Sequence, residues 1–182
     1  LRRFPPGPPP AAAAPDLAGS DHRSRALLTR LLDGDAAAGP LLRAEYDAQA
    51  AGWSEWCATQ PDYIAPLADA LDRLAVSAGP GGVLEVGCGT GQATALLARR
   101  FGGVWASDVS IAMLRGMPTL AGVAALAADV RALPFRDASL DLVVGLNAVP
   151  ALDEFARVLR RGGRVRWARI FREHMPVSVE QM

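Results

Sequence analysis

The residues with the clearest chemical potential form a glycine-rich segment that is followed, at a distance, by an acidic residue. Residues 83–92 read Val-Leu-Glu-Val-Gly-Cys-Gly-Thr-Gly-Gln. Glycine has no Cβ, so the backbone there can adopt positive φ and a ligand can lie directly against it. A helix that begins after the turn would point unpaired backbone N–H groups at that ligand. Asp108 ends the next apolar run about 20 residues later, where doubly wound nucleotide folds place a ribose-binding carboxylate. The pattern predicts a nucleoside-type cofactor.

The elements that would position these residues alternate between strand and helix. Apolar runs predict strands at 83–86, 104–106, 123–127, 140–145 and 164–171. Helical spacing predicts helices at 92–100, from Ser110 through Leu114, and from Leu152 to Leu159, the last closed by Gly162-Gly163. This alternation predicts an α/β fold: a Rossmann-like, doubly wound, mostly parallel sheet with helices on both faces.

The N-terminal part has a different composition. Residues 1–20 are rich in proline and alanine and are expected to be a disordered tail. Residues 21–78 are expected to be a helical segment that covers the substrate, with helices at 23–32, 41–52 and from Pro61 through Ala75. The glycines at 34 and 39, with Pro40, are expected to end the first of these helices. Residues 79–182 would then be the cofactor-binding core.

Composition excludes several classes of function. The chain has 182 residues, the size of one domain, and 51% of them are hydrophobic, enough for a buried core. Nineteen basic residues balance 19 acidic ones, so no overall field attracts nucleic acid or anionic lipid. No apolar run has the length of a membrane span, and a cytoplasmic protein is expected. Two cysteines, Cys57 and Cys88, provide neither a disulfide framework nor metal-ligand spacing.

The glycine spacing separates two classes of cofactor. The dinucleotide fingerprint requires a third glycine at its sixth position, where this chain has Gln92. Residues 83–171 instead resemble the class I S-adenosylmethionine-dependent methyltransferases, in particular those that methylate small molecules. The resemblance rests on motifs in the family's order: 84–91 (LEVGCGTG), 107–114 (SDVSIAML), 128–135 (ADVRALPF), 140–144 (LDLVV) and 157–165 (RVLRRGGRV).

The resemblance implies a role for each motif. Glu85 would hold the ammonium group of the cofactor, and Asp108 would accept hydrogen bonds from both ribose hydroxyls. The adenine would pack on Val109 and Met113, with Asp129 accepting from its N6 amine and the Val130 N–H facing a ring nitrogen. The remaining cofactor contacts come from the glycine turn, which wraps the methionine part, and from the end of the fourth strand: Gly87, Cys88, Gly89, Gly91, Leu146 and Asn147.

Structural alternatives to these roles stay open. Asp108 could simply favour a helix N-terminus, and Asp129 and Asn147 could be turn residues. Cys88 fits a turn that requires a small side chain. Glu85 is harder to explain without a partner, because burying an unpaired carboxylate is costly.

The chain departs from the family pattern in two respects. Residues 145–150 contain no histidine, and only His22 and His174 occur in the chain, so no general base is identified. The family normally continues through two more strands, whereas Ser178-x-x-Gln181 has the form of a helix capping box, so we expect a C-terminal portion to be absent. Arg164, Arg166 and Arg169 favour an edge strand instead.

Four aromatic residues of the N-terminal segment are candidates to line an acceptor site: Tyr46, Trp53, Trp56 and Tyr63. They could equally pack the N-terminal helices onto the sheet. An aromatic, uncharged lining suits a small apolar or aromatic acceptor, and the lack of a basic patch argues against nucleic acid. The leading hypothesis is methyl transfer to a small molecule by in-line displacement, leaving S-adenosylhomocysteine. The alternatives are a catalytically inactive cofactor-binding partner or regulatory protein, and a nicotinamide-dependent oxidoreductase.

Overall fold

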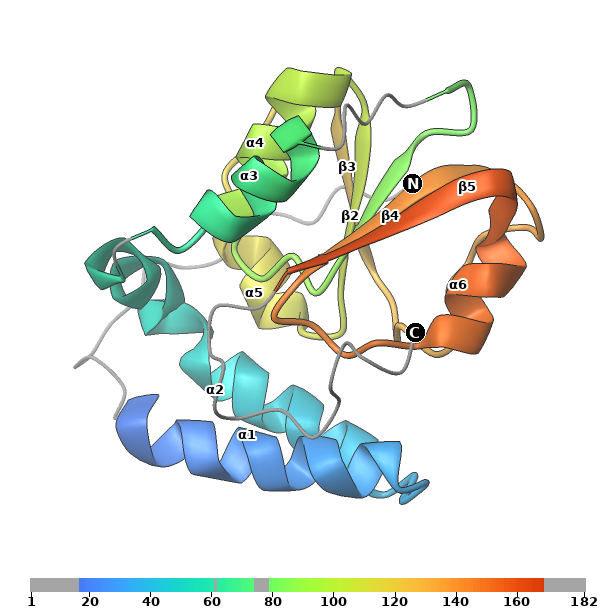
Figure 1. Cartoon of the computed structure of the whole chain (residues 1–182). Helices are drawn as coiled ribbons and strands as arrows, with labels where there is room; N and C mark the ends of the chain where they lie inside the picture. Colours follow the sequence, from blue (N-terminus) through green and yellow to red (C-terminus); the bar gives the residue numbers. More distant parts are fainter. Residues whose placement is uncertain (1–16, 61, 74–78, 169–182) are drawn as a thin grey trace.

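A parallel sheet forms the centre of the molecule. The computed structural model describes residues 17–60, 62–73 and 79–168 (Figure 1). Five strands pair in the order β3-β2-β1-β4-β5 within these residues, and every pairing is parallel. The strands are β1 (Val83–Val86), β2 (Val104–Asp108), β3 (Val123–Ala127), β4 (Leu140–Leu146) and β5 (Leu159–Ala168). The order reverses between β1 and β4, so a crevice forms at the carboxyl ends of these two strands.

The central strands are apolar because both of their faces are covered. Every residue of β1 and β4 is buried, including Glu85 and Asp141. The edge strand β5 differs, since it pairs with β4 alone among the described strands and exposes Arg160, Arg161 and Arg164. Charged side chains are tolerated at such an edge because one side of the strand meets solvent.

Helices cover both faces of the sheet, as the alternating sequence pattern predicts. One face packs against α3 (Ala65–Arg73) and α4 (Gln92–Phe101), where Leu71 and Leu97 join Val83 and Val144 in one core cluster. The same face receives α5 (Ile111–Gly116). The opposite face packs against α6 (Leu152–Val158), whose Phe155 contacts a second cluster. The predicted Rossmann-like fold is confirmed.

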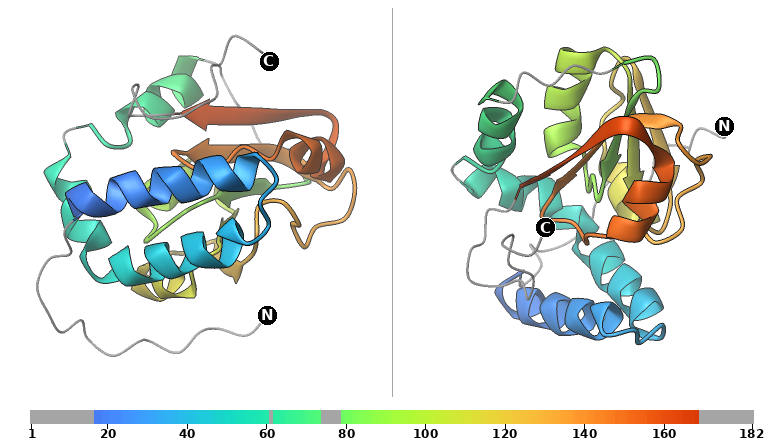
Figure 2. Two further views of the ribbon diagram at one scale, coloured as in Figure 1. Left: turned by 90° about the horizontal axis from the view of Figure 1, so that it is seen from below. Right: turned by 45° about the vertical axis from the view of Figure 1, so that its right-hand side comes forward.

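Two N-terminal helices cross the carboxyl end of the sheet. The helices α1 (Leu17–Leu32) and α2 (Ala38–Thr59) lie side by side there (Figure 2). Leu27, Leu28 and Leu31 of α1 pack on Leu42 of α2 in a cluster of their own. We call these two helices the lid.

Several boundaries differ from the sequence predictions. The first helix begins at Leu17, before the predicted end of the tail. Gly39 and Pro40 do not end that helix but lie in the first turn of α2, where a proline costs no intrahelical hydrogen bond. The second helix continues past Gly52 to Thr59 because Trp53 and Cys57 keep facing the interior.

The last helix is shorter than predicted. It ends at Val158, and Leu159 already pairs with Leu140 of β4, so Gly162-Gly163 lie within β5 rather than closing a helix. The predictions for residues 1–16, 61, 74–75, 169–171 and 178–181 concern positions outside the described residues.

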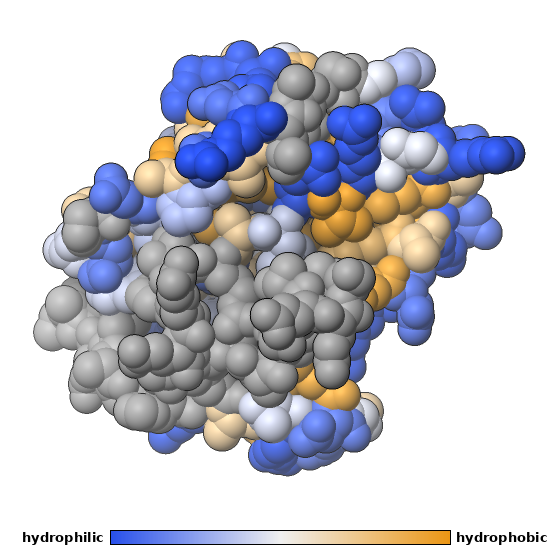
Figure 3. All heavy atoms as spheres, viewed as in Figure 1, coloured by the Kyte–Doolittle hydropathy of each residue, from blue (hydrophilic) through white to orange (hydrophobic). Residues whose placement is uncertain are grey.

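The surface shown in Figure 3 separates polar from apolar regions. Hydrophilic side chains gather over α3 and α4, and an apolar patch lies over β5. Val165 and Trp167 on that strand are partly exposed. Within the described part of the chain, no helix has the length and hydropathy needed to cross a bilayer.

Candidate active site

The glycine turn after β1 is packed so closely that its glycines are required. Gly87, Gly89 and Gly91 all have positive φ, at 65°, 53° and 90°. A Cβ on Gly87 would lie 2.5 Å from the Ala148 Cβ, and one on Gly91 would lie 2.6 Å from the Met117 Cγ. Helix α4 begins directly after Gly91 with no side-chain cap. Its first backbone N–H groups therefore remain available to a ligand in the turn.

Asp108 connects this turn to the end of β2. Its Oδ2 accepts a hydrogen bond from the Gly89 N–H at 2.8 Å, and its Oδ1 accepts one from the Ser110 N–H at 2.8 Å. Ser110 also caps α5, as its position predicted, by accepting from the Met113 N–H. Burial raises the pKa of Asp108. Each carboxylate oxygen has a further lone pair, so Asp108 can still accept hydrogen bonds from a ligand.

Glu85 is a buried acid in the middle of β1. Its side chain is 2% exposed and accepts a hydrogen bond from the Thr94 hydroxyl at 2.6 Å. Burial raises its pKa to about 8, and the nearby Asp108 adds to the shift. Within the described residues, no lysine, arginine or histidine forms an ion pair with it. A cationic group of a ligand would give the buried Glu85 carboxylate the ion-pair partner that the described residues do not supply.

Asp129 follows β3, and its carboxylate already accepts hydrogen bonds from Arg131. The Arg131 guanidinium donates to both of its oxygens, the shortest contact being 2.7 Å, and the Arg131 backbone N–H donates as well. These bonds lower the pKa of Asp129. An adenine amine would therefore share Asp129 with Arg131, a contact that the sequence reasoning did not foresee.

The loop after β4 places Asn147 opposite the glycine turn. Asn147 has a φ of 57°, and its N–H donates to the Ala168 carbonyl at 3.0 Å. The next residue of this loop, Ala148, lies against the glycine turn, because a Cβ on Gly87 would be 2.5 Å from the Ala148 Cβ. Asp141, expected to be structural, lies away from this region and pairs with Arg160 and the Gly82 N–H.

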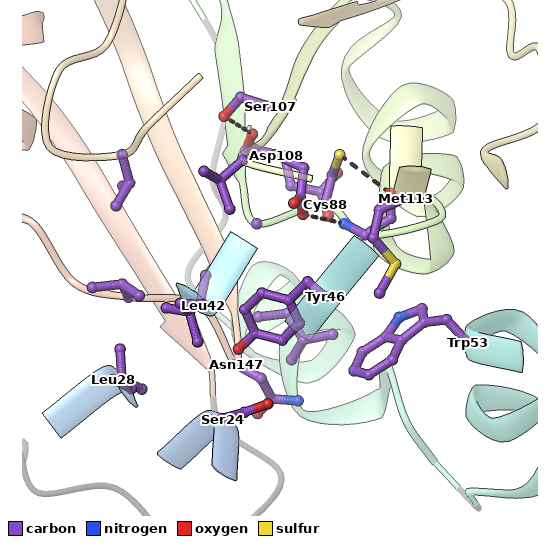
Figure 4. Close-up of a pocket in the computed structure, with 18 of the residues that line it drawn as sticks. Ser24, Leu28, Leu42, Tyr46, Trp53, Cys88, Ser107, Asp108, Met113 and Asn147 are labelled. Atoms are coloured by element: carbon purple, nitrogen blue, oxygen red, sulfur yellow. Dashed lines mark hydrogen bonds between the residues drawn. The ribbon is translucent and has the colours of Figure 1, made fainter. Parts of the chain in front are cut away.

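The lid encloses one cavity together with these loops. The cavity has a volume of about 380 Å³. Figure 4 shows Tyr46 projecting into it from α2, with Leu28 and Leu42 on the lid side and Asp108 and Met113 on the opposite side. Of the sixteen residues predicted for cofactor or acceptor, all but Gly91 line this cavity: Tyr46, Trp53, Trp56, Tyr63, Glu85, Gly87, Cys88, Gly89, Asp108, Val109, Met113, Asp129, Val130, Leu146 and Asn147.

Three of the four aromatic residues also pack on one another. Trp53 and Trp56 lie with ring centroids 5.1 Å apart, and Tyr63 meets Trp56 edge to face at 6.1 Å. The Trp53 Nε1 would lie 3.0 Å from a Cβ on Gly89, so this indole covers the glycine turn. Trp53, Trp56 and Tyr63 therefore pack on one another and also line the cavity.

Sequence reasoning missed the polar contacts that fasten α2 over the turn. The Asp47 carboxylate accepts from the Ser110 hydroxyl at 2.6 Å and from the Ala112 N–H at 3.2 Å. The Ser54 and Thr90 hydroxyls lie 2.8 Å apart and share a hydrogen bond. Asp47 and Ser54 are seven residues apart, which places them on one face of a helix. This spacing is the sequence feature that could have indicated that Asp47 and Ser54 face the same part of the molecule.

Other missed residues line the lid side of the cavity. They include the apolar Leu28, Leu31, Leu42 and Val149, the polar Ser24 and Gln49, and Arg131 at the opposite wall. Gln49 occurs at helical spacing between Tyr46 and Trp53, so the periodicity of α2 could have identified it.

Comparison with known proteins agrees with this geometry. Residues 83–163, from β1 into β5, match the family model described as a methyltransferase domain. This segment of the chain is a methyltransferase domain of the class I S-adenosylmethionine-dependent type. A Haloferax volcanii protein solved in complex with the methyltransferase activator Trm112 shares the fold, with a TM-score of 0.58 and 28% identity over 66% of this chain and 58% of that one.

Curated methyltransferases are also similar in sequence. The malonyl-[acyl-carrier protein] O-methyltransferase of Halorhodospira halophila is 34% identical over 130 residues, which cover 68% of this chain and 43% of that protein. The demethylmenaquinone methyltransferase of Clavibacter sepedonicus is 42% identical over 94 residues, which cover 46% of this chain and 38% of that protein. The chain spans less than half the length of these relatives.

The cavity suits S-adenosylmethionine, the cofactor of this class of methyltransferase domain. S-adenosylmethionine carries a sulfonium and an ammonium group but no phosphate, so it favours acidic partners over basic ones. The acidic residues on the cavity wall, within the described part of the chain, are Glu85, Asp108 and Asp129, and the basic one is Arg131, which pairs with Asp129. The particular role of each residue stays a prediction.

Proposed function

We propose that this chain transfers a methyl group from S-adenosylmethionine to a small, mostly apolar acceptor that binds beneath the lid. The observation that carries the proposal is the single cavity that joins the glycine turn and Asp108 to the apolar inner side of α1 and α2. A methyltransferase must hold cofactor and acceptor in contact, and one enclosed space accommodates both.

The wall formed by the strand ends is assigned to the cofactor. Glu85, held by Thr94, faces the ammonium group, and Asp108 accepts from the ribose hydroxyls while its bonds to Gly89 and Ser110 fix its orientation. Val109, Met113 and Val130 line this wall and would hold the adenine ring. Gly87 and Gly89 let the methionine part approach the backbone.

The lid is assigned to the acceptor and to the exclusion of water. When bound, S-adenosylmethionine supplies an electrophilic methyl group on a sulfonium that leaves as a thioether. The chain's task is then to align a nucleophile with that methyl group, and alignment in a closed site supplies much of the acceleration. Trp53 covers the turn, and Leu28, Leu42 and Tyr46 hold the acceptor against it.

Proton removal does not depend on a histidine in the described lining. The lining residues of the cavity include no histidine, and burial raises the pKa of Tyr63, which keeps that hydroxyl protonated. The arrangement therefore favours acceptors that are already nucleophilic or that ionise easily.

The similar proteins act on different acceptors, as their names state: a malonyl thioester of acyl-carrier protein and demethylmenaquinone. A turnover assay separates the possibilities. The protein is incubated with S-adenosylmethionine and either 1,4-dihydroxynaphthalene or malonyl-N-acetylcysteamine, and S-adenosylhomocysteine and methylated product are measured by mass spectrometry. We expect both products to appear together with the naphthalenediol and to decrease in Asp108→Ala when S-adenosylmethionine is below saturation. Cofactor binding without turnover of either acceptor would favour a catalytically inactive cofactor-binding protein.

A further inference from the structure

Gln49 is a buried amide on the lid side of the cavity. Its side chain lines the cavity and is 4% exposed. Leu28, Leu31 and Leu42 line the same side, and burying an amide without hydrogen-bond partners is costly. A glutamine at this position should therefore form hydrogen bonds to other polar groups.

The hydrogen bonds of Gln49 determine which of its atoms is available. Its Nε2 donates to the Ser24 hydroxyl at 3.2 Å and to the Glu45 carboxylate at 3.4 Å. A carboxylate only accepts hydrogen bonds, so the NH₂ end of Gln49 must face Glu45. Both N–H donors are thus used within the protein, and no described residue donates to the Gln49 Oε1.

The charged groups near Gln49 indicate which charge the acceptor can carry. Glu45 lies beside Gln49, with 11% of its side chain exposed, and is paired with Arg23, while Glu85 and Asp108 are the other acids near the cavity. Arg131, the basic residue of the described lining, is paired with Asp129. An anionic acceptor would therefore find no unpaired cationic side chain among the described lining residues.

We propose that Gln49 is the acceptor-recognition residue, and that its Oε1 accepts a hydrogen bond from a hydroxyl or N–H group of an uncharged, largely apolar acceptor. This inference rests on the proposed function and narrows its substrate class. The apolar part of the acceptor packs on Leu28, Leu31 and Leu42, and the donor group orients it. A site built to accept a hydrogen bond rejects an analogue without the donor, because the buried carbonyl is then left unpaired.

The test uses three probes of similar shape: 2-naphthol, which has a donor; 2-methoxynaphthalene, which has none; and 2-naphthoate, which is anionic. Each is titrated into protein saturated with S-adenosylhomocysteine. We expect 2-naphthol to bind about 10-fold more tightly than the ether, the scale of one hydrogen bond, and to bind more tightly than the carboxylate. Gln49→Met, which keeps the length of the side chain but removes the carbonyl, should reduce the preference for the naphthol over the ether to near unity.

Gln60→Met is the matched control. Gln60 follows α2, bonds to Thr59 and does not line the cavity, so the naphthol preference should persist in this variant. Equal binding of naphthol and ether by the unmodified protein, tighter binding of the carboxylate, or no binding of any probe would overturn the inference, whether or not Gln49→Met folds. The preliminary saturation with S-adenosylhomocysteine keeps the two proposals distinct, because a protein that does not bind it contradicts the proposed function itself.

Discussion

The Asp108 carboxylate accepts a hydrogen bond from the Gly89 backbone N–H at 2.8 Å and thereby joins the end of β2 to the glycine turn after β1. The two residues are 19 positions apart in sequence and meet because their strands are parallel neighbours. A ligand held by one of these loops is therefore placed relative to the other.

Replacing this carboxylate should weaken cofactor binding. Asp108→Ala removes the acceptor for the ribose hydroxyls and frees the turn, and we expect S-adenosylhomocysteine to bind with about 1–3 kcal/mol less free energy, the scale of lost charge-assisted hydrogen bonds. Calorimetric titration measures the difference. Asp153→Ala, at an exposed position of α6, is the control and should bind normally. Unchanged affinity in Asp108→Ala would remove this residue from the site.

The glycine turn should not tolerate a side chain. In Gly89→Val the side chain meets the Trp53 indole and fills the space assigned to the cofactor, so binding should be lost while most of the fold is kept. Gly102→Val is a control for backbone strain, because Gly102 also has positive φ, at 74°, but has no atom within 4 Å of a Cβ. Circular dichroism and ligand titration of both variants check this. Normal binding by Gly89→Val would contradict the assignment of the turn.

Cofactor binding should release a proton. The pKa of Glu85 is about 8 in the ligand-free protein, so this carboxyl is mostly protonated at pH 7. Pairing with a ligand ammonium favours its ionised form. Titration with S-adenosylhomocysteine in buffers of different ionisation enthalpy should show proton release at pH 7, and affinity should rise from pH 6 to pH 8. Glu85→Gln should abolish the release attributed to this residue. Proton uptake in the unmodified protein would contradict this role.

The Glu85 carboxyl group should also make the free energy of unfolding depend on pH. Glu85 has an ordinary pKa of about 4.3 when unfolded, below its value of about 8 in the fold. The folded protein therefore holds this proton more tightly, and the contribution to stability is present below about pH 4 and is lost as pH rises toward 8. Urea unfolding of the ligand-free protein between pH 5 and 8 should show a smaller decline in Glu85→Gln than in the unmodified protein. Equal slopes would indicate that Glu85 is ionised in the fold.

The lid should depend on the contact between Asp47 and α5. Asp47→Ala removes bonds to the Ser110 hydroxyl and the Ala112 N–H, and we expect a loss of about 1–2 kcal/mol in the free energy of unfolding. Asp69→Ala breaks only an exposed ion pair with Arg73 and should cost under about 1 kcal/mol. Urea denaturation compares the two. A similar small effect in both variants would mean that Asp47 does not fasten the lid.

The residues around the glycine turn could be placed at the cavity from the sequence because their signals are local. Glycine spacing and the position of Asp108 after an apolar run are read over a few residues, and the parallel sheet brings the strand ends together. The turn, the helix cap at Ser110 and the positions of β1 and β3 were predicted for this reason.

The lid side could not be predicted as fully because its contacts join distant residues. Asp47 meets Ser110 across 63 positions, and Gln49 meets Ser24 across 25. Nothing near Asp47 in sequence identifies its partner. The pairing of Asp129 with Arg131 is local, but a carboxylate and an arginine two positions apart occur in many solvated turns, so the sequence did not show that it faces the cavity.

The most direct test of the central claim is a calorimetric titration of the protein with S-adenosylhomocysteine, with NAD as the control ligand. We expect saturable binding of one S-adenosylhomocysteine per chain, weakened in Asp108→Ala, and no binding of NAD. No binding of S-adenosylhomocysteine, or tighter binding of NAD, would contradict the central claim.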